Sequence, residues 1–285
     1  MSRTSRVAVV TDSTAYLPDG LASRYGVVVV PVQVVIDGRV GSEGVDVSPA
    51  EVAAALGQRH PAVSTSRPAP QAFLDAYDAA AETGAGTIVS VHLSGALSGT
   101  VDSARLAARE RPEHDIRVLD SGSLTMGLGF AVLAAAELAS AGAEARDVER
   151  AAVTAAARTC TMFYVDNLEH LRRGGRLNTA QAMLGSALMV KPLLRVSDGR
   201  ISLLEKVRTA SRGLARLADL AVQEAGDDAV DIAVHHLAAG TRAAELAEQL
   251  RTRIPRVTTM YLSEVGAVVG AHVGPGLVGV VVHRR

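Results

Sequence analysis

The chain has 285 residues, about half of them hydrophobic, a single cysteine and a formal net charge of −1 at pH 7. This length suffices for two domains, or one large α/β domain, with a sizeable core. The near-zero charge gives no general attraction to nucleic acid or anionic membranes, and a chain without tryptophan has few side chains that stack on bases. A lone cysteine excludes an intrachain disulfide, and the N-terminal apolar run is too short for a signal peptide. We therefore expect a cytoplasmic protein that does not bind nucleic acid.

The first half alternates valine-rich runs with alanine-rich helical patterns, which is typical of α/β folds. Ser48 and Pro49 have the residue types of a helix cap and first helical turn. The stretch 128–138 is apolar on nearly every face, which predicts a helix surrounded by protein. We expect strands at 6–10, 27–36, 87–92 and 116–119, and helices at 18–25, from 49, at 71–81, from 100 and from 124.

The composition changes near Arg158, so we expect one α/β domain over residues 1–157 and a second over 158–285, each a sheet flanked by helices. Asp166 is the expected cap of a helix at 166–173, which the glycines after Arg173 would end. Asp198-Gly199 predicts a hairpin. Further strands are expected at 230–235, 257–262 and 277–283, with a helix at 241–252.

Residues 94–100, Ser-Gly-Ala-Leu-Ser-Gly-Thr, are the most informative segment because they join a strand end to a helix start with small hydroxyl side chains and free backbone amides. Such a helix start favours an anion. Ser98 and Thr100 have the alternative role of helix caps, whereas Ser94 comes too early to cap. The segment lacks the Gly-x-Ser-x-Gly pattern of α/β-hydrolases. A Ser–His–Asp hydrolase using His92 or His272 remains an alternative, because triads are spatial.

Three further segments carry candidate residues. Residues 63–70 hold successive hydroxyls, including Thr65, and are otherwise a plain Ser/Pro loop. Residues 168–178 set three arginines around a glycine pair; Arg172 and Arg173 suit a helix C-terminus, whereas Arg176 lies beyond it and suits a phosphate or a partner carboxylate. Residues 266–276 are expected to form a glycine-rich loop around His272, which is either a satisfied core or turn residue or a functional histidine. The chain has no phosphate-binding loop, dinucleotide fingerprint or zinc-ligand spacing, so we expect no cofactor and no metal.

Taken in order, these segments resemble the DegV family of bacterial lipid-binding proteins, which includes the fatty-acid-binding subunit of the bacterial fatty acid kinase. The resemblance covers essentially the whole chain. The matching pieces are 10–15 (Val-Thr-Asp-Ser-Thr-Ala), 30–32, 65–68 (Thr-Ser-Arg-Pro), 94–100, 119–121, 171–177 (Leu-Arg-Arg-Gly-Gly-Arg-Leu), 191–194, 198–201, 206–209 and 272–276.

The resemblance implies a two-domain fold that buries a long-chain fatty acid in a tunnel, for which the 124–138 helix is the candidate wall. It implies a non-catalytic carrier that presents the carboxylate to a separate ATP-dependent kinase subunit for acyl-phosphate formation, with transient membrane contact as a further expectation. By position, the carboxylate would contact Thr65, Ser94, Gly95 and Ser98, the head-group network would include Arg208 and His272, and Arg173 and Arg176 would face the kinase subunit or a membrane.

Two positions depart from the family pattern. Arg67 stands where glutamine is more usual, and Gly95 stands where a second serine is common. The backbone N–H of Gly95 is therefore the alternative to Ser94 as the main carboxylate donor. The alternative function is a serine hydrolase acting on a lipid-like ester.

Overall fold

The computed structural model describes residues 6–59, 62–177 and 190–285, and the chain forms two compact units. The first consists of Met1–Gln33 and Ser66–Ala157, and the second of Val34–Thr65 and Arg158–Arg285. The change of unit after residue 157 coincides with the predicted border. The continuous domain predicted for 1–157 is interrupted, however, because Val34–Thr65 groups with the C-terminal half.

A buried contact explains why this insert belongs to the second unit. Helix α2 (Pro49–Leu56) packs on helix α11 (Ala267–Val273). Near the start of α11, the backbone N–H of Val268 donates to the buried carboxylate of Glu43 at 2.7 Å. Sequence patterns do not show pairings across more than 200 residues, so the predicted domain border could not include this insert.

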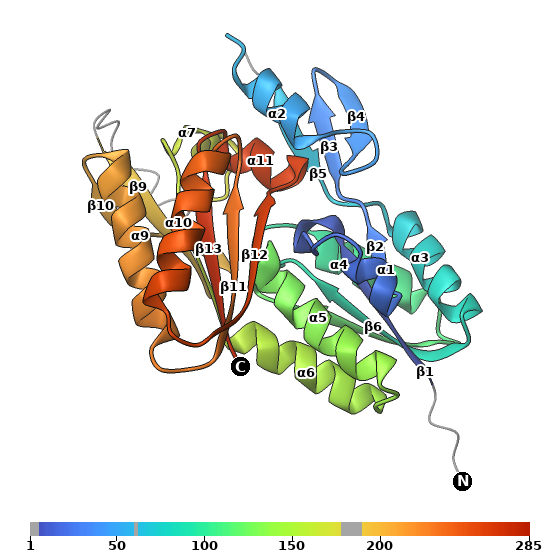
Figure 1. The fold of residues 1–285 in the computed structure, drawn as a ribbon. Helices are drawn as coiled ribbons and strands as arrows, with labels where there is room; N and C mark the ends of the chain where they lie inside the picture. The colour runs from blue at the N-terminus through green and yellow to red at the C-terminus, as the bar shows by residue number, and fades with distance from the viewer. Residues whose placement is uncertain (1–5, 60–61, 178–189) are drawn as a thin grey trace. The chain divides into compact units, whose positions relative to one another are not determined.

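The first unit has a parallel sheet of four strands in the order β2-β1-β6-β7, as expected for an α/β unit. Alternate side chains of β1 face opposite layers: Val7 and Val9 pack with α5, whereas Val10 packs with α3. Helices α3 and α4 thus cover one face and α5 and α6 the other (Figure 1). The strands are β1 (Arg6–Asp12), β2 (Val28–Val30), β6 (Ala85–His92) and β7 (Asp115–Asp120); the helices are α1 (Leu21–Tyr25), α3 (Pro70–Glu82), α4 (Thr100–Arg109), α5 (Met126–Ser140) and α6 (Ala145–Ala157), with a 3-10 turn η1 (Ser13–Ala15) after β1.

The helix ends correct two expectations for this unit. Helix α1 begins only after Gly20, which has a φ of 80°, so it is shorter than the predicted 18–25; Gly26 ends it as predicted. Gly99 is the N-cap of α4 and no side chain caps that helix, so the capping role considered for Ser98 and Thr100 is wrong. Helix α5 is buried on most of its faces, as predicted, and belongs to the core of this unit. Its role as a tunnel wall stays a prediction.

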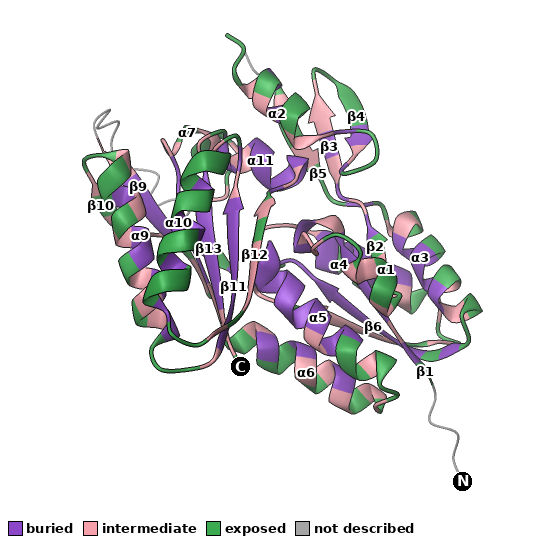
Figure 2. Ribbon diagram, in the orientation of Figure 1, coloured by how far each residue is buried: buried purple, intermediate pink, exposed green. Residues whose placement is uncertain are grey.

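The second unit is built on a mixed sheet of six strands in the order β10-β9-β8-β13-β11-β12. Val230, Ile232 and Val234 of β11 point to one face, where they pack with helices α9 and α10. Figure 2 shows the central strands β11 and β13 as mostly buried and the outer side of α10 as exposed. The strands are β8 (Thr159–Tyr164), β9 (Lys191–Ser197), β10 (Arg200–Val207), β11 (Val230–His236), β12 (Val257–Glu264) and β13 (Val278–Arg284); the helices are α7 (Glu169–Arg173), α9 (Ala210–Ala225) and α10 (Gly240–Arg253).

A small sheet has the strand order β4-β3-β5. Strands β3 (Gln33–Ile36) and β4 (Arg39–Ser42) come before α2 in the chain, and β5 (Val63–Ser66) comes after it. Ser48 caps α2 through a capping box with Glu51, and Pro49 is its first residue, as predicted. In the part of the chain that the structure describes, no helix combines the length and apolar character needed to cross a bilayer.

Two expectations for the second unit are wrong. Asp166 does not cap α7, whose N-cap is Leu168. Its carboxylate instead accepts hydrogen bonds from Tyr164 and Lys191. Residues 266–276 are not simply a glycine-rich loop, because they contain helix α11. The sequence did not predict this helix because four glycines fall within eleven residues, and glycine disfavours helices.

Candidate binding site

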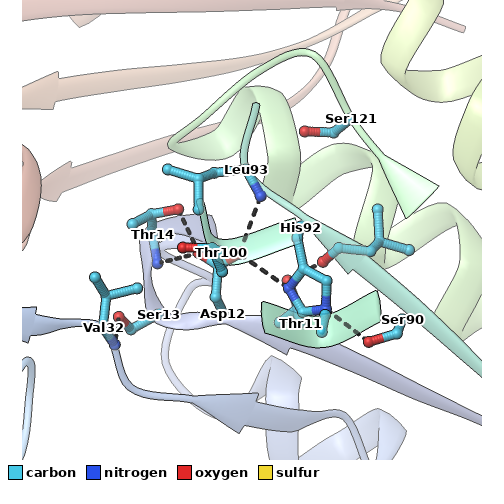
Figure 3. A network of polar contacts seen from close by, with 12 residues as sticks. Thr11, Asp12, Ser13, Thr14, Val32, Ser90, His92, Leu93, Thr100 and Ser121 are labelled. Carbon is cyan, nitrogen blue, oxygen red and sulfur yellow. Dashed lines mark hydrogen bonds and ion pairs between the residues drawn. The ribbon is translucent and has the colours of Figure 1, made fainter. Parts of the chain in front are cut away.

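A fully buried network of polar side chains joins the ends of two neighbouring strands in the first unit (Figure 3). Asp12 ends β1, and His92 ends the adjacent parallel strand β6. The Asp12 carboxylate accepts hydrogen bonds from the backbone N–H of Thr14 at 3.1 Å, the Thr14 hydroxyl at 2.5 Å and the Leu93 N–H at 3.0 Å. The two Thr14 donors bind Oδ1, and His92 Nδ1 lies 3.1 Å from Oδ2, the oxygen that also accepts from Leu93. Each oxygen of this buried charge is therefore hydrogen-bonded, as burial requires.

The network continues behind the imidazole of His92. His92 Nε2 lies 2.6 Å from the hydroxyl of Ser90, and Ser90 lies 3.0 Å from the hydroxyl of Tyr77. Asp12, His92 and Ser90 thus have the contact order of a hydrolase triad, but all three are completely buried. A nucleophile must reach a substrate, so this arrangement is a structural lock between strands. Burial also raises the pKa of Tyr77 to about 12, so its phenol stays neutral.

This lock bears on the hydrolase alternative. Both ring nitrogens of His92 are already bonded to Asp12 and Ser90, so His92 is not positioned as a general base for Ser94. From the sequence, Asp12 was only part of the matching segment 10–15, with no binding or catalytic role of its own. The signal that could have identified it was the pair of polar residues at the carboxyl ends of two parallel strands, since such ends meet at one edge of a sheet.

The predicted hydroxyl segment follows β6 in the same unit. Ser94 is only 1% exposed, and its hydroxyl accepts from the Ala96 N–H at 3.2 Å. The Gly95 N–H donates to Asp120 at 3.1 Å, and a Cβ at Gly95 would lie 2.9 Å from that carboxylate oxygen. The backbone amide considered as an alternative fatty-acid donor is thus already bound to a carboxylate of its own chain.

The rest of this segment is half-buried. The hydroxyl of Ser98 lies 2.9 Å from that of Thr100. The guanidinium of Arg67, one of the two departures from the family pattern, lies against Gly99, where an added Cβ would be 2.7 Å from its Nη1. A larger residue at position 99 would therefore displace Arg67. No observation assigns Ser94, Gly95 or Ser98 a ligand, and their role stays a prediction.

The second unit contains a different hydroxyl–imidazole pair. The hydroxyl of Thr65, at the end of β5, lies 2.8 Å from Nε2 of His272 on α11. The two residues are 207 positions apart, and each is partly exposed. The structure thus brings together one predicted carboxylate contact and one predicted head-group residue. Thr65 belongs to a different unit from Ser94, Gly95 and Ser98.

The surroundings of His272 keep it uncharged. Burial, with a smaller contribution from the positive charge of Arg176, lowers the pKa of His272 to about 4. Nδ1 of His272 is buried and has no hydrogen-bond partner within residues 6–59, 62–177 and 190–285. At neutral pH the pair therefore offers one hydroxyl and one neutral imidazole, and no fixed cation.

The predicted arginines occupy three different environments. Arg173 is exposed on α7 and pairs with Glu169 at 2.6 Å, one helical turn away. Arg176 is half-buried near His272 and donates to the Gly174 carbonyl at 2.5 Å. Its side chain is therefore less exposed than that of Arg173. Arg208 is exposed after β10, and the described residues provide it with no ion-pair partner. It is therefore not drawn into the Thr65–His272 pair in this structure.

The fold and these sites define a class: an α/β protein of two units with a neutral polar pair in the second. A family model described as "Uncharacterised protein, DegV family" matches residues 6–285. The chain therefore belongs to the DegV family, and the resemblance seen in the sequence is confirmed.

Relatives and solved structures agree with this assignment. A DegV domain-containing protein of Streptomyces coelicolor is 54% identical over the full length of both chains, and one of Mycobacterium tuberculosis is 40% identical over 97% of this chain and 96% of the relative. A structure of a DegV family protein from Thermus thermophilus, described by its fatty acid binding, has a TM-score of 0.91 at 32% identity, covering 98% of this chain and 100% of that one. DegV of Bacillus subtilis, described as a fatty acid binding protein, has a TM-score of 0.90 at 31% identity, covering 99% and 100%. The predicted α/β DegV fold is thereby confirmed.

Proposed function

We propose that this protein binds a long-chain fatty acid and that the Thr65–His272 pair contacts its carboxylate. The observation that carries the proposal is this neutral pair. Its two residues come from segments of the second unit that are far apart in the sequence, and both are partly exposed. The fatty acid binding described for the Thermus thermophilus and Bacillus subtilis proteins supports the same ligand class.

The proton arrangement of the pair suits a carboxylate. A neutral imidazole carries one N–H, on either Nδ1 or Nε2. Nδ1 has no hydrogen-bond partner among the described residues and lies directly against Gly174, where an added Cβ would overlap it. A proton on Nδ1 would be crowded against this backbone, whereas an unprotonated Nδ1 can face the Cα–H of Gly174 as a weak acceptor. With the proton on Nε2, the ring donates to the Thr65 oxygen, and the Thr65 hydroxyl proton is released to donate to a ligand. We therefore assign the Nε2–H tautomer.

The acyl chain supplies most of the affinity in this account. A long-chain acid offers about 14 methylenes, each worth roughly 0.8 kcal/mol on burial, or about 11 kcal/mol before ordering costs. A hydrogen bond to a charged group adds about 1.5–3 kcal/mol. The polar pair thus orients the head group and prevents the penalty of an unpaired buried carboxylate.

We further propose that the protein is a non-catalytic carrier in the cytoplasm. A separate ATP-dependent subunit would phosphorylate the bound acid to an acyl phosphate, with Arg173 on the surface that meets this partner. Neutral donors support this role, because a head group clamped by a fixed cation would be a poorer nucleophile. Ser94 and Ser98 belong to the first unit, and their contact with a carboxylate stays a separate prediction.

Native mass spectrometry tests the ligand. After gentle desalting, or after adding oleate to delipidated protein, we expect a mass increment of one fatty acid. Absence of any increment with excess oleate would overturn the proposal. With the cognate kinase subunit, a Thr65→Ala/Ser94→Ala double variant should lose most phosphorylation of bound acid, and unchanged turnover would refute the assigned contacts.

The same protein separates a carrier from a hydrolase. Incubation with a p-nitrophenyl ester of a fatty acid should release no p-nitrophenol beyond the background rate. Release that Ser94→Ala abolishes would establish the hydrolase alternative instead.

A further inference from the structure

Helices α7 and α11 of the second unit interlock through two histidine rings and two glycines. The ring of His272, on α11, lies directly against Gly174, where an added Cβ would overlap Nδ1. The ring of His170, on α7, lies directly against Gly274, where an added Cβ would overlap Cδ2. Each helix therefore accommodates the imidazole of the other at a glycine that follows its own last turn.

The two glycines differ in why they are required. Gly174 has a φ of −73°, which any residue adopts, so crowding alone excludes a side chain there: chiefly the His272 ring, with the His170 carbonyl oxygen at 3.2 Å as a milder contact. Gly274 has a φ of 74°, so both its backbone conformation and the His170 ring require glycine. Gly174 is therefore the cleaner position for a substitution, since alanine there changes contacts and leaves the backbone preference intact.

Further contacts hold the segment after α7 in place. The Arg176 guanidinium donates to the carbonyl of Gly174, the same residue that Nδ1 of His272 contacts. The His170 ring is half-buried, and burial followed by the charge of Arg173 lowers its pKa, so it too enters this contact as a neutral ring. The interlock thus consists of neutral rings and backbone, and no ion pair has to be desolvated to form it.

We infer that the segment from His170 to Arg176 positions the His272 ring for its contact with Thr65. His170 and Gly174 are positioning residues: neither contacts the proposed ligand, but displacement of either helix would move Nε2 of His272 away from the Thr65 hydroxyl. This inference rests on the proposed function, in which that pair contacts the carboxylate.

The primary experiment reads the His272 ring itself. In protein labelled with 15N-histidine, the imidazole nitrogen shifts of His272 report its tautomer. We expect the Nε2–H form in the wild type, and a shift away from it in Gly174→Ala together with at least tenfold weaker oleate binding. Gly57→Ala is the matched control, because its Cβ meets only ordinary contacts in the same unit, and it should change neither readout.

Identical His272 shifts and oleate affinities within twofold of wild type in Gly174→Ala would overturn the inference. If Gly174→Ala does not fold, His170→Ala removes the reciprocal ring without introducing a clash, and the same two readouts apply. The nitrogen shifts of His272 can be measured without a ligand. If the wild type binds no oleate, the proposed function is refuted, and the shifts of Gly174→Ala still test the positioning role.

A double-mutant cycle separates positioning from general packing. In the wild-type background the methyl group added by Gly174→Ala clashes with the His272 ring. In a double variant that also carries His272→Ala, this ring is absent and the clash disappears. We therefore expect the loss of thermal stability caused by Gly174→Ala to be largely relieved in the double variant. Additive losses would show that Gly174 acts through some group other than His272.

Discussion

The two units each contain a histidine bonded to a hydroxyl side chain, and the two pairs differ in what surrounds them. In the first unit His92 lies between Asp12 and Ser90, and all three residues are completely buried. In the second unit Thr65 is the only hydrogen-bond partner of His272 among the described residues, and both are partly exposed. The same residue types therefore form a closed lock in one unit and an open pair in the other.

The comparison shows that burial and a third group, more than residue identity, decide what such a pair can do. Asp12 and Ser90 together occupy both ring nitrogens of His92, and Asp12 also holds Leu93 at the end of the neighbouring strand, so neither ring nitrogen is available to a ligand. Within the described residues no carboxylate binds the Thr65–His272 pair, and in the proposed Nε2–H tautomer the Thr65 hydroxyl keeps a proton that a ligand can accept. Three predictions test this contrast.

Asp12→Asn should have the largest effect, on stability. The amide nitrogen cannot accept hydrogen bonds, so one set of buried donors loses its acceptor, at a cost of about 3 kcal/mol in the free energy of unfolding. Urea denaturation measures this loss. Asp19→Asn, on the exposed loop before α1, is the control and should change it by less than about 0.5 kcal/mol. Equal effects of both substitutions would mean that Asp12 does not form the lock described.

Mild acid should destabilise the protein by a smaller amount. Burial lowers the pKa of His235 to about 4, whereas an unfolded histidine titrates near 6.5. Below pH 6.5 the unfolded chain binds a proton that the folded chain refuses until about pH 4, so stability falls as the pH decreases through this window. For His235 the loss from pH 7 to pH 5 is about 2 kcal/mol, and His272 adds a loss of the same sign.

Denaturation midpoints at pH 7, 6 and 5 measure this dependence. In a His235→Gln variant, which has no group to protonate there, the slope over this range should be shallower than in the wild type. A stability that rises toward pH 5 in the wild type would contradict the uncharged state of these histidines.

Arg173→Ala should have the smallest effect on stability. Its ion pair with Glu169 is exposed, so the free energy of unfolding should change by less than about 0.5 kcal/mol. Oleate binding should also stay unchanged, while phosphorylation by the kinase subunit should decrease. Equal phosphorylation of this variant and the wild type would remove Arg173 from the proposed partner surface.

The local elements of the fold could largely be predicted from the sequence because their signals are short-range. Ser48 and Pro49 mark a helix start, Asp198-Gly199 marks the β9–β10 hairpin, and the apolar stretch ending at residue 138 marks a buried helix. Helix α11 escaped prediction because its glycines serve close packing, which a propensity argument reads as the absence of a helix.

The sites could be predicted only in part. Thr65 and His272 were selected through the family resemblance, whereas their 2.8 Å contact depends on tertiary packing that no spacing shows. The same limit hid the Asp12–His92 lock, although both residues stand at strand ends. Arg176 was assigned to the surface because it follows the helix, but its side chain folds back toward Gly174 and His272.

The most direct test of the central claim uses oleate labelled with 13C at its carboxyl carbon. Bound to wild-type protein, the carboxylate should give one signal distinct from that of the free acid. In Thr65→Val this signal should move and oleate affinity should fall about tenfold, the loss of one hydrogen bond to a charged group. Thr258→Val, an exposed strand position in the same unit, should reproduce the wild type. An unmoved signal and unchanged affinity in Thr65→Val would contradict the account.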